Sequence, residues 1–344
     1  MLTLKSWLHR AIALVALGVV AYLFWPLLKE IRAAARLFAS AHWGWLAAAV
    51  LLQLGSYSTL TWLNVLALRP FPGRIGFWRL MCVLTAMAFI TSAVPSAGAS
   101  GVVLRARLLA RYGYTVEAST FSLLLQILYM VVGTVAVCLF GLGYLLQMGR
   151  VTAGEIVLLA VLVLLTACLL WFGWRLVSNP HRALNLLEKL AGFWNRLASR
   201  FGWRRLHPDA LEARLEAFHR GLLELDKVPR WKFLAATTGR VLLDVASLGA
   251  CFAAFGHLIR PDILLLSYGI LMVISTLAII PGGLGLADVS LPVVFSRFGV
   301  PGPVALAAGL SYRLLAFWLV RIIGFTAWQV LESKARGPRK AKEA

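Results

Sequence analysis

Charged residues, and acidic residues above all, are scarce in this sequence. Asp, Glu, Lys and Arg together make up 14% of the 344 residues, whereas a soluble globular domain carries roughly 25%. Only 14 residues are acidic, against 34 Lys and Arg, which gives a net charge of +20. In a soluble protein such an excess would suggest nucleic acid, but the chain has no recognisable nucleic-acid-binding motif. We therefore expect no nucleic-acid partner and attribute the positive charge to membrane topology and anionic lipid head groups.

Cysteine and histidine are too few and too scattered for metal or disulfide chemistry. All four cysteines lie within apolar runs and none forms a CxxC pair, so neither a metal site nor a disulfide is expected. The six histidines form no HExxH or similar pair. The chain also lacks GxSxG, a Walker loop and a GxGxxG followed by a suitable acid. We expect no cofactor, no ATP-driven activity and no catalytic set, and thus a protein that is not an enzyme.

Long apolar runs dominate the sequence instead. Hydrophobic residues make up 60% of the chain, and the mean hydropathy is +0.82. Several runs reach the roughly 20 residues that a helix needs to cross a bilayer. The apolar segments lie at 8–28, 44–67, 77–94, 118–147, 154–177, 233–258, 262–280 and 303–331. They predict an all-α fold, a polytopic membrane helical bundle that forms a single integral membrane domain over residues 1–344.

Two polar stretches lie apart from the apolar runs. Residues 178–230 carry Leu and Phe at helical spacing among charged residues, which predicts an amphipathic helical insertion on the cytoplasmic surface of the membrane. The stretch is too short for a separate catalytic domain. Residues 332–344 are rich in Lys and Arg and are expected to form a basic, disordered tail.

The distribution of basic residues favours six full spans over eight. If all eight segments crossed the membrane, the arginines after the third segment and the 178–230 stretch would both lie outside, against the positive-inside rule. If 77–110 and 262–298 each enter the membrane and return to the same side, both become cytoplasmic. We therefore predict about six spans plus two Pro/Gly-broken re-entrant hairpins, with both termini in the cytoplasm of a bacterium and the chain in its inner membrane.

The two predicted hairpins resemble each other. The stretches "ITSAVPSAGASG" and "TLAIIPGGLGLA" are both apolar and then broken by Pro and Gly, and "RYGY" and "RFGV" follow at equal distances. A shift of 186 residues aligns Pro95 with Pro281, Arg111 with Arg297, and Gly113 with Gly299. Since the predicted topology makes the hairpins enter from opposite faces, the pattern is that of an inverted repeat.

The second break is the first candidate for a binding site. Pro281, Gly282, Gly283 and Gly285 allow a sharp turn and free backbone amides, which survive at membrane depth only when buried in protein or lining a wet cavity. A helix that restarts after the break would direct its N-terminal amides at an anion such as phosphate. The alternative is a simple connecting loop near the interface, with Asp288 as a helix cap.

Ionisable residues within the apolar helices are further candidates. Arg240 and Asp244 lie four residues apart and can pair on one helix face, either as a structural ion pair or as part of a functional site. Arg313 lies deep in the last span, so its guanidinium would need Asp288, Asp244 or a bound phosphate as its partner. Arg321 is expected to extend towards the inner surface.

The arginines after the first break, Arg105, Arg107 and Arg111, suit either a surface role or a head-group site.

The segments that contain the two breaks also resemble a known family. "VPSAGASGVVLRARLLARYGY", "IIPGGLGLAD", "RFGV" and "GLSYRLLAFW" resemble the two signatures of the lysylphosphatidylglycerol synthase transmembrane-region family, whose members are also called flippase-like membrane proteins. The resemblance extends over nearly the whole chain.

The resemblance assigns particular positions. The block from Pro281 to Asp288 and the downstream Arg313 match the second signature, while Gly101 and Arg105 match the first. Val102 stands where an acid is usual, and Asp288 where many relatives carry Glu. Bifunctional relatives carry a soluble aminoacyl-transferase domain after the membrane part; this chain ends without one, so synthase activity is not expected.

The family likeness implies lipid translocation. Our leading hypothesis is a flippase-like translocator that moves an anionic, aminoacylated or isoprenoid lipid between leaflets, with membrane lipids as its partners. The residues predicted to bind the substrate are Asp288, Arg313, Arg240, Asp244, Arg105, Pro281, Gly282, Gly283, Gly285 and Gly101. The alternative is a non-transporting scaffold that holds a lipid- or glycan-modifying enzyme through 178–230.

Overall fold

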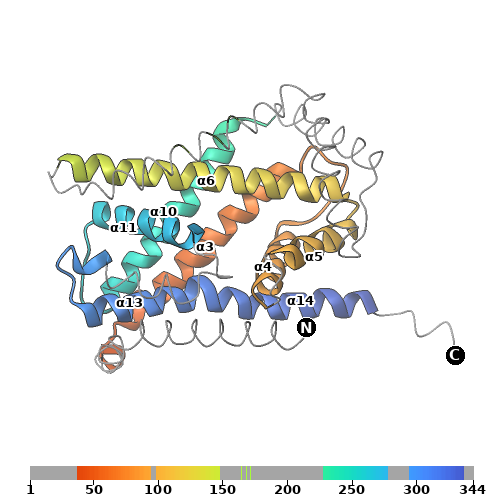
Figure 1. The fold of residues 1–344 in the computed structure, drawn as a ribbon. Helices are drawn as coiled ribbons and strands as arrows, with labels where there is room; N and C mark the ends of the chain where they lie inside the picture. The colour runs from red at the N-terminus through yellow and green to blue at the C-terminus, as the bar shows by residue number, and fades with distance from the viewer. Residues whose placement is uncertain are drawn as a thin grey trace, which may run out of the picture. The chain divides into compact units, whose positions relative to one another are not determined.

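The computed structural model of the protein describes residues 37–93, 98–147, 164, 168, 171, 228–277 and 294–336. Within these residues every regular element is a helix (Figure 1). The helices are α3 (Trp43–Leu68), α4 (Phe77–Ala93), α5 (Ala99–Ala110), α6 (Val116–Gln147), α10 (Arg230–Ala254), α11 (Pro261–Leu277), α13 (Gly302–Arg313), the π-helix η2 (Leu314–Leu319) and α14 (Val320–Arg336). The prediction of an all-α fold is confirmed.

Several of the described helices are long and apolar enough to cross a membrane, judged by length and composition. These candidate spans are Trp43–Leu68, Val116–Val137, Arg230–Ala254 and Gly302–Ser333. They coincide with four of the six predicted spans; the other two, at 8–28 and 154–177, lie outside the described residues except for 164, 168 and 171. The prediction of a multi-pass helical membrane protein is confirmed, and the number of six spans stays a prediction.

The last helical stretch contains a change of helix type. It starts at Gly302–Pro303, where proline is tolerated because the first turn has no amide partner to lose. After Arg313 it becomes the π-helix η2, and it continues as α14 to Arg336. The helix therefore extends past Glu332, where the disordered tail was predicted to begin.

The described residues form two compact units. Unit 1 contains residues 37–54, 140–144, 242–277 and 294–319, and unit 2 contains 55–93, 98–139, 145–147, 228–241 and 320–336. The boundaries fall inside α3, α6 and α10 and between η2 and α14. Each long helix thus contributes one part to unit 1 and another part to unit 2.

In unit 2, α4 and α5 form a hairpin whose two ends meet. The Arg74 N–H before α4 donates to the Tyr112 carbonyl after α5, at 3.0 Å, and the two helices lie side by side, in orange in Figure 1. At 1.5 Å per residue they are roughly 25 Å and 18 Å long, against about 30 Å of bilayer hydrocarbon. The hairpin thus begins and ends on the same side of unit 2, and both helices are shorter than the roughly 20 residues of a typical spanning helix. That the hairpin enters the membrane and returns stays a prediction.

Glycine brings the hairpin helices close together, and α14 packs along α4. A Cβ on Gly101 would overlap the Thr91 hydroxyl and come within 3.0 Å of the Met87 carbonyl oxygen. A Cβ on Gly324 in α14 would overlap the backbone carbonyl of Thr85 in α4. These contacts allow backbone-to-backbone packing, which is the main means of helix association where no water drives apolar surfaces together.

In unit 1, the second half of α10 packs on the first half of α3. The Ser247 hydroxyl donates to the Ala49 carbonyl at 3.0 Å, and the His42 N–H donates to the Ala254 carbonyl at 2.8 Å. On α11, a side-chain carbon of Leu264 lies 2.9 Å from where a Cβ on Gly249 would be. Polar groups and small residues therefore bring these three helices together.

Local structure recurs in the two units at the shift of 186 residues. α6 begins at Val116 and α13 at Gly302. Just before them, Gly113 and Gly299 adopt φ values of 82° and 78°, in the left-handed region that glycine enters without steric cost. At both sites the glycine N–H donates to a carbonyl three residues earlier and the next N–H to one five residues earlier. This is the Schellman pattern that ends a helix.

Candidate functional site

Arg105 lies at the centre of a buried polar cluster in unit 2. From α5, its Nη2 donates to Asn64 Oδ1 on α3 at 2.7 Å and to Ser122 Oγ on α6 at 2.6 Å. Its Nη1 lies 3.5 Å from Gln126 Oε1, also on α6. Asn64 Nδ2 donates to the same Gln126 oxygen at 2.9 Å, which orients both amides. We call these four residues the Arg105 cluster.

The Arg105 guanidinium carries its charge without a carboxylate partner among the described residues. The side chain is 0% exposed, and each of its bonds ends on a neutral oxygen. Its Nε is buried and has no hydrogen-bond partner in the described part of the chain. A buried cation that only dipoles compensate is costly. The surface role that the sequence suggested for Arg105 is therefore wrong, whereas the head-group role stays a prediction.

A second buried cluster, in unit 1, surrounds a carboxylate. Asp244 Oδ1 accepts a hydrogen bond from Gln53 Nε2 at 3.1 Å, and Oδ2 accepts one from the Tyr268 hydroxyl at 3.0 Å. Asp244 is 3% exposed. We call these three residues the Asp244 cluster; α3, α10 and α11 each contribute one side chain. Arg240, one turn earlier on α10, places its guanidinium carbon 5.1 Å from the Tyr57 ring centroid, and its pairing with Asp244 stays a prediction.

The two arginines of the last helical stretch occupy different surroundings. The Arg313 guanidinium carbon lies 5.0 Å from the Phe317 ring centroid, so it contacts the π-helical segment. Arg321 Nε donates to Ser92 Oγ at 3.1 Å. Ser92 is near the C-terminal end of α4, so Arg321 contacts that end of the helix. The expectation that Arg321 extends to the inner surface stays a prediction.

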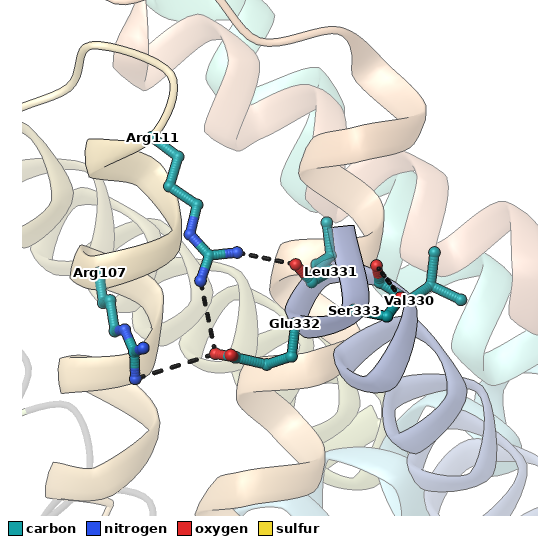
Figure 2. Close-up of polar contacts among 6 residues, drawn as sticks. All are labelled: Arg107, Arg111, Val330, Leu331, Glu332 and Ser333. Atoms are coloured by element: carbon teal, nitrogen blue, oxygen red, sulfur yellow. Dashed lines mark hydrogen bonds and ion pairs between the residues drawn. The ribbon is translucent and has the colours of Figure 1, made fainter. Parts of the chain in front are cut away.

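Arg107 and Arg111 connect the end of α5 to α14, as Figure 2 shows. Arg111 Nη1 donates to the Leu331 carbonyl at 2.8 Å, and its Nη2 lies 3.5 Å from Glu332 Oε1. Arg107 lies 3.8 Å from the same carboxylate oxygen, with 66% of its side chain exposed. Exposed ion pairs of this kind contribute up to about 1 kcal/mol to the free energy of unfolding. Their main effect is thus to position the end of α5 against α14.

Several predicted site residues lie outside the described residues. These are Pro281, Gly282, Gly283, Gly285 and Asp288. The stretch 178–227, on which the scaffold alternative depends, also lies outside them. Gly101 is described and packs against α4, where a Cβ would overlap the Thr91 hydroxyl; its predicted role in substrate binding stays a prediction. Within the described ranges no group of three or more His, Cys, Asp or Glu side chains could hold a metal ion.

The neutral members of both clusters were not predicted from the sequence. Gln53, Asn64 and Gln126 are carboxamides inside long apolar runs, where a polar side chain normally faces protein and forms interhelical hydrogen bonds. A carboxamide inside a long apolar run is therefore a sequence signal for a buried interhelical contact. Their partners could not be identified, because Asn64 and Arg105 are 41 residues apart and Gln53 and Asp244 are 191 apart.

Long apolar helices with buried ionisable side chains define a multi-pass helical membrane protein with polar sites within its helical units. Ionisable residues in such positions indicate function. The family model described as "Lysylphosphatidylglycerol synthase TM region" matches residues 12–324, so the chain belongs to this family. The resemblance recognised in the sequence is confirmed.

Curated relatives agree with this assignment. The chain is 23% identical to a UPF0104 membrane protein of Methanocaldococcus jannaschii, over 71% of this chain and 72% of the relative. Two UPF0104 membrane proteins of Methanothermobacter thermautotrophicus are 31% and 33% identical over shorter stretches, which cover 24% and 25% of this chain and 25% of each relative.

Proposed function

We propose that the protein moves an anionic lipid between the leaflets of a bacterial inner membrane. The single observation that carries the proposal is the Arg105 guanidinium, which is fully buried on a short hairpin and surrounded by neutral oxygens. A membrane protein retains a buried cation at a cost in stability. An anionic head group would supply the missing countercharge during transport.

The chemistry of the site suits a phosphate group. A guanidinium offers five N–H donors in a planar fork that matches phosphate oxygens, and Arg105 Nε is still without a partner among the described residues. The head group would pass through protein while the acyl chains stay in lipid. In this proposal Arg313 also contacts phosphate, and Asp288 binds a proton or a cationic part of the head group.

The recurrence of local structure at the shift of 186 residues supports an inverted repeat. The Schellman turns at Gly113 and Gly299 precede helices that start in register. If the predicted topology holds, the two hairpins enter from opposite faces. Translocators with inverted repeats use this relation to expose one site alternately to each side.

Arg105→Met tests the proposal, because it separates function from folding. Methionine removes a buried charge that is costly to keep but leaves Asn64 Oδ1 without the donor from Arg105, which costs about 1–3 kcal/mol. We therefore expect the free energy of unfolding to change by no more than about 2 kcal/mol. Transbilayer movement of labelled phosphatidylglycerol in proteoliposomes should fall at least about tenfold, or about 1.4 kcal/mol. Thermal unfolding in detergent gives the first quantity and a fluorescence-quenching assay gives the second.

Arg107→Met is the matched control, because Arg107 lies on the same helix and is largely exposed. It should leave both stability and lipid movement unchanged. Arg105→Lys keeps the charge and should retain part of the activity. Lipid movement at the wild-type rate in Arg105→Met would contradict the proposal. It would also be contradicted if Arg105→Met unfolds and Arg105→Lys folds but moves no lipid, because the charge would then serve folding alone.

A further inference from the structure

The Asp244 cluster in unit 1 is the second place where charge is buried, and its geometry differs from that of the Arg105 cluster. Here the two oxygens of one carboxylate face two neutral donors, Gln53 Nε2 at 3.1 Å and the Tyr268 hydroxyl at 3.0 Å. All three side chains are at most 3% exposed. A carboxylate at such a depth is stabilised by these donors, and protonation would remove its charge altogether.

Gln53 can serve both protonation states of this carboxylate. Its Oε1 is buried and has no hydrogen-bond partner in the described part of the chain, although Nε2 of the same amide binds Asp244. A carboxamide carries two donors at one end and an acceptor at the other. Rotating the amide by half a turn would replace the donor with an acceptor, which is what the O–H of a protonated Asp244 requires.

We propose that Asp244 is a proton-binding site whose proton uptake and release is coupled to lipid movement; only the coupling rests on the proposed function. In the binding step one proton from water joins a carboxylate oxygen of Asp244. The carboxylic O–H then donates to Gln53 Oε1 after the amide has rotated, while Tyr268 keeps donating to the other oxygen. Release reverses the step.

Further charged and titratable groups lie on the three helices that form the Asp244 cluster. The other charged and titratable residues of the three helices are Tyr57 on α3, Arg230, Lys232, Arg240 and Cys251 on α10, and Asp262 on α11. Arg240 is one turn from Asp244 and is the nearest of the cations along α10.

The arrangement fits a proton better than a sodium ion. Gln53 and Tyr268 each present a hydrogen atom to the carboxylate, whereas a metal ion needs oxygen lone pairs directed at it. Tyr268 would have to turn its hydrogen away for a metal to bind. An effect of sodium instead of pH is therefore an outcome that the experiment can distinguish.

Infrared difference spectroscopy tests the site directly. The full-length protein in phosphatidylglycerol vesicles is taken from alkaline to acidic buffer, and the C=O stretching band of a protonated carboxylic acid is recorded. We expect a band that appears on acidification, is lost in Asp244→Asn and shifts in Gln53→Leu, because the acid then lacks its acceptor. Asp262→Asn is the matched control on α11, since Asp262 pairs with Arg260 at 2.9 Å, and it should keep the band unchanged.

Lipid movement is measured in the same vesicles with labelled phosphatidylglycerol and an imposed pH gradient. Wild-type protein should respond to the gradient, and Asp244→Asn should lose that response. If the Asp244 band is present without any lipid movement, the proposed function fails and the proton site stands. If lipid moves but the band is absent, responds to sodium instead of pH, or persists in Asp244→Asn, the proton site is wrong. A band that Gln53→Leu does not shift would overturn the role of the amide.

Discussion

At the scale of single residues, the two clusters place charges of opposite sign among neutral side chains from neighbouring helices. Arg105 is held by an asparagine, a serine and a glutamine, and Asp244 by a glutamine and a tyrosine. Neutral hydrogen bonds orient a charged group but leave much of its charge uncompensated in a low-dielectric interior. The Arg105 guanidinium, whose described partners are all neutral, can therefore still bind an anion.

Gln126→Glu tests this reading of the Arg105 cluster. Gln126 Oε1 accepts from Asn64 and lies 3.5 Å from Arg105 Nη1, so glutamate keeps both contacts and adds a countercharge. Hydrogen bonds to charged groups contribute about 1.5–3 kcal/mol, against about 1 kcal/mol for neutral ones. We therefore expect the free energy of unfolding to rise by about 1 kcal/mol. Lipid movement should fall about tenfold, because Arg105 is now neutralised.

The control for this change lies on the same helix. Gln147 is exposed near the end of α6, so Gln147→Glu should alter stability by less than about 0.5 kcal/mol. Thermal unfolding measures the change in stability of Gln126→Glu and Gln147→Glu, and the lipid assay measures the change in their rates of lipid movement. A Gln126→Glu protein that moves lipid as fast as the wild type would show that the free charge of Arg105 is not used.

At the scale of elements, α14 holds the α4–α5 hairpin along its length. Gly324 packs on the α4 backbone, the Phe89 ring lies 5.2 Å from Phe325 and 6.2 Å from Trp328, and Arg111 donates to the carbonyl of Leu331 (Figure 2). In a membrane this close packing replaces the hydrophobic effect as the source of helix association. Gly324, the small residue at the crossing point, thus allows the close approach that the other contacts hold.

Gly324→Ala should loosen that crossing. The added methyl would overlap the Thr85 carbonyl, and overpacking of this kind costs about 1–3 kcal/mol. Gly143→Ala is the control, because a Cβ there meets nothing within 4 Å; it should be neutral or slightly stabilising, since alanine is the better helix former. Unfolding temperatures of both variants in detergent measure the difference. Equal unfolding temperatures would refute the packing role of Gly324.

The helices themselves could be predicted closely from sequence, but their contacts could not. The expected segments 44–67 and 77–94 correspond to α3 and α4 within a residue or two, because length and hydropathy determine which stretches can be helical in a bilayer. Apart from the match of Arg105 to the family signature, nothing local distinguishes it from the exposed Arg107 two residues later. Their difference arises from which face of α5 meets α3 and α6, and that follows from packing.

At the scale of the whole molecule, function depends on which side of the membrane each connection faces. The hydrogen bond between Arg74 and Tyr112 brings the two ends of the first hairpin together. If those ends are in the cytoplasm, the positive-inside rule is satisfied for the arginines around them. The second predicted hairpin, 262–298, would then begin and end on the outer side, which is the relation that alternating access requires.

Cysteine accessibility tests this topology. Arg74, Arg107, Arg260 and Arg297 are all exposed in the structure, and each is replaced by cysteine, one at a time, in a protein whose four native cysteines are serine or alanine. A membrane-impermeant thiol reagent applied to intact cells should label the cysteines at 260 and 297 but not those at 74 and 107. Inverted vesicles should give the opposite pattern, because the membrane then shields the outer connections. Labelling of 74 and 107 from opposite sides would show that the first hairpin crosses the membrane, and the inverted-repeat mechanism would fail with it.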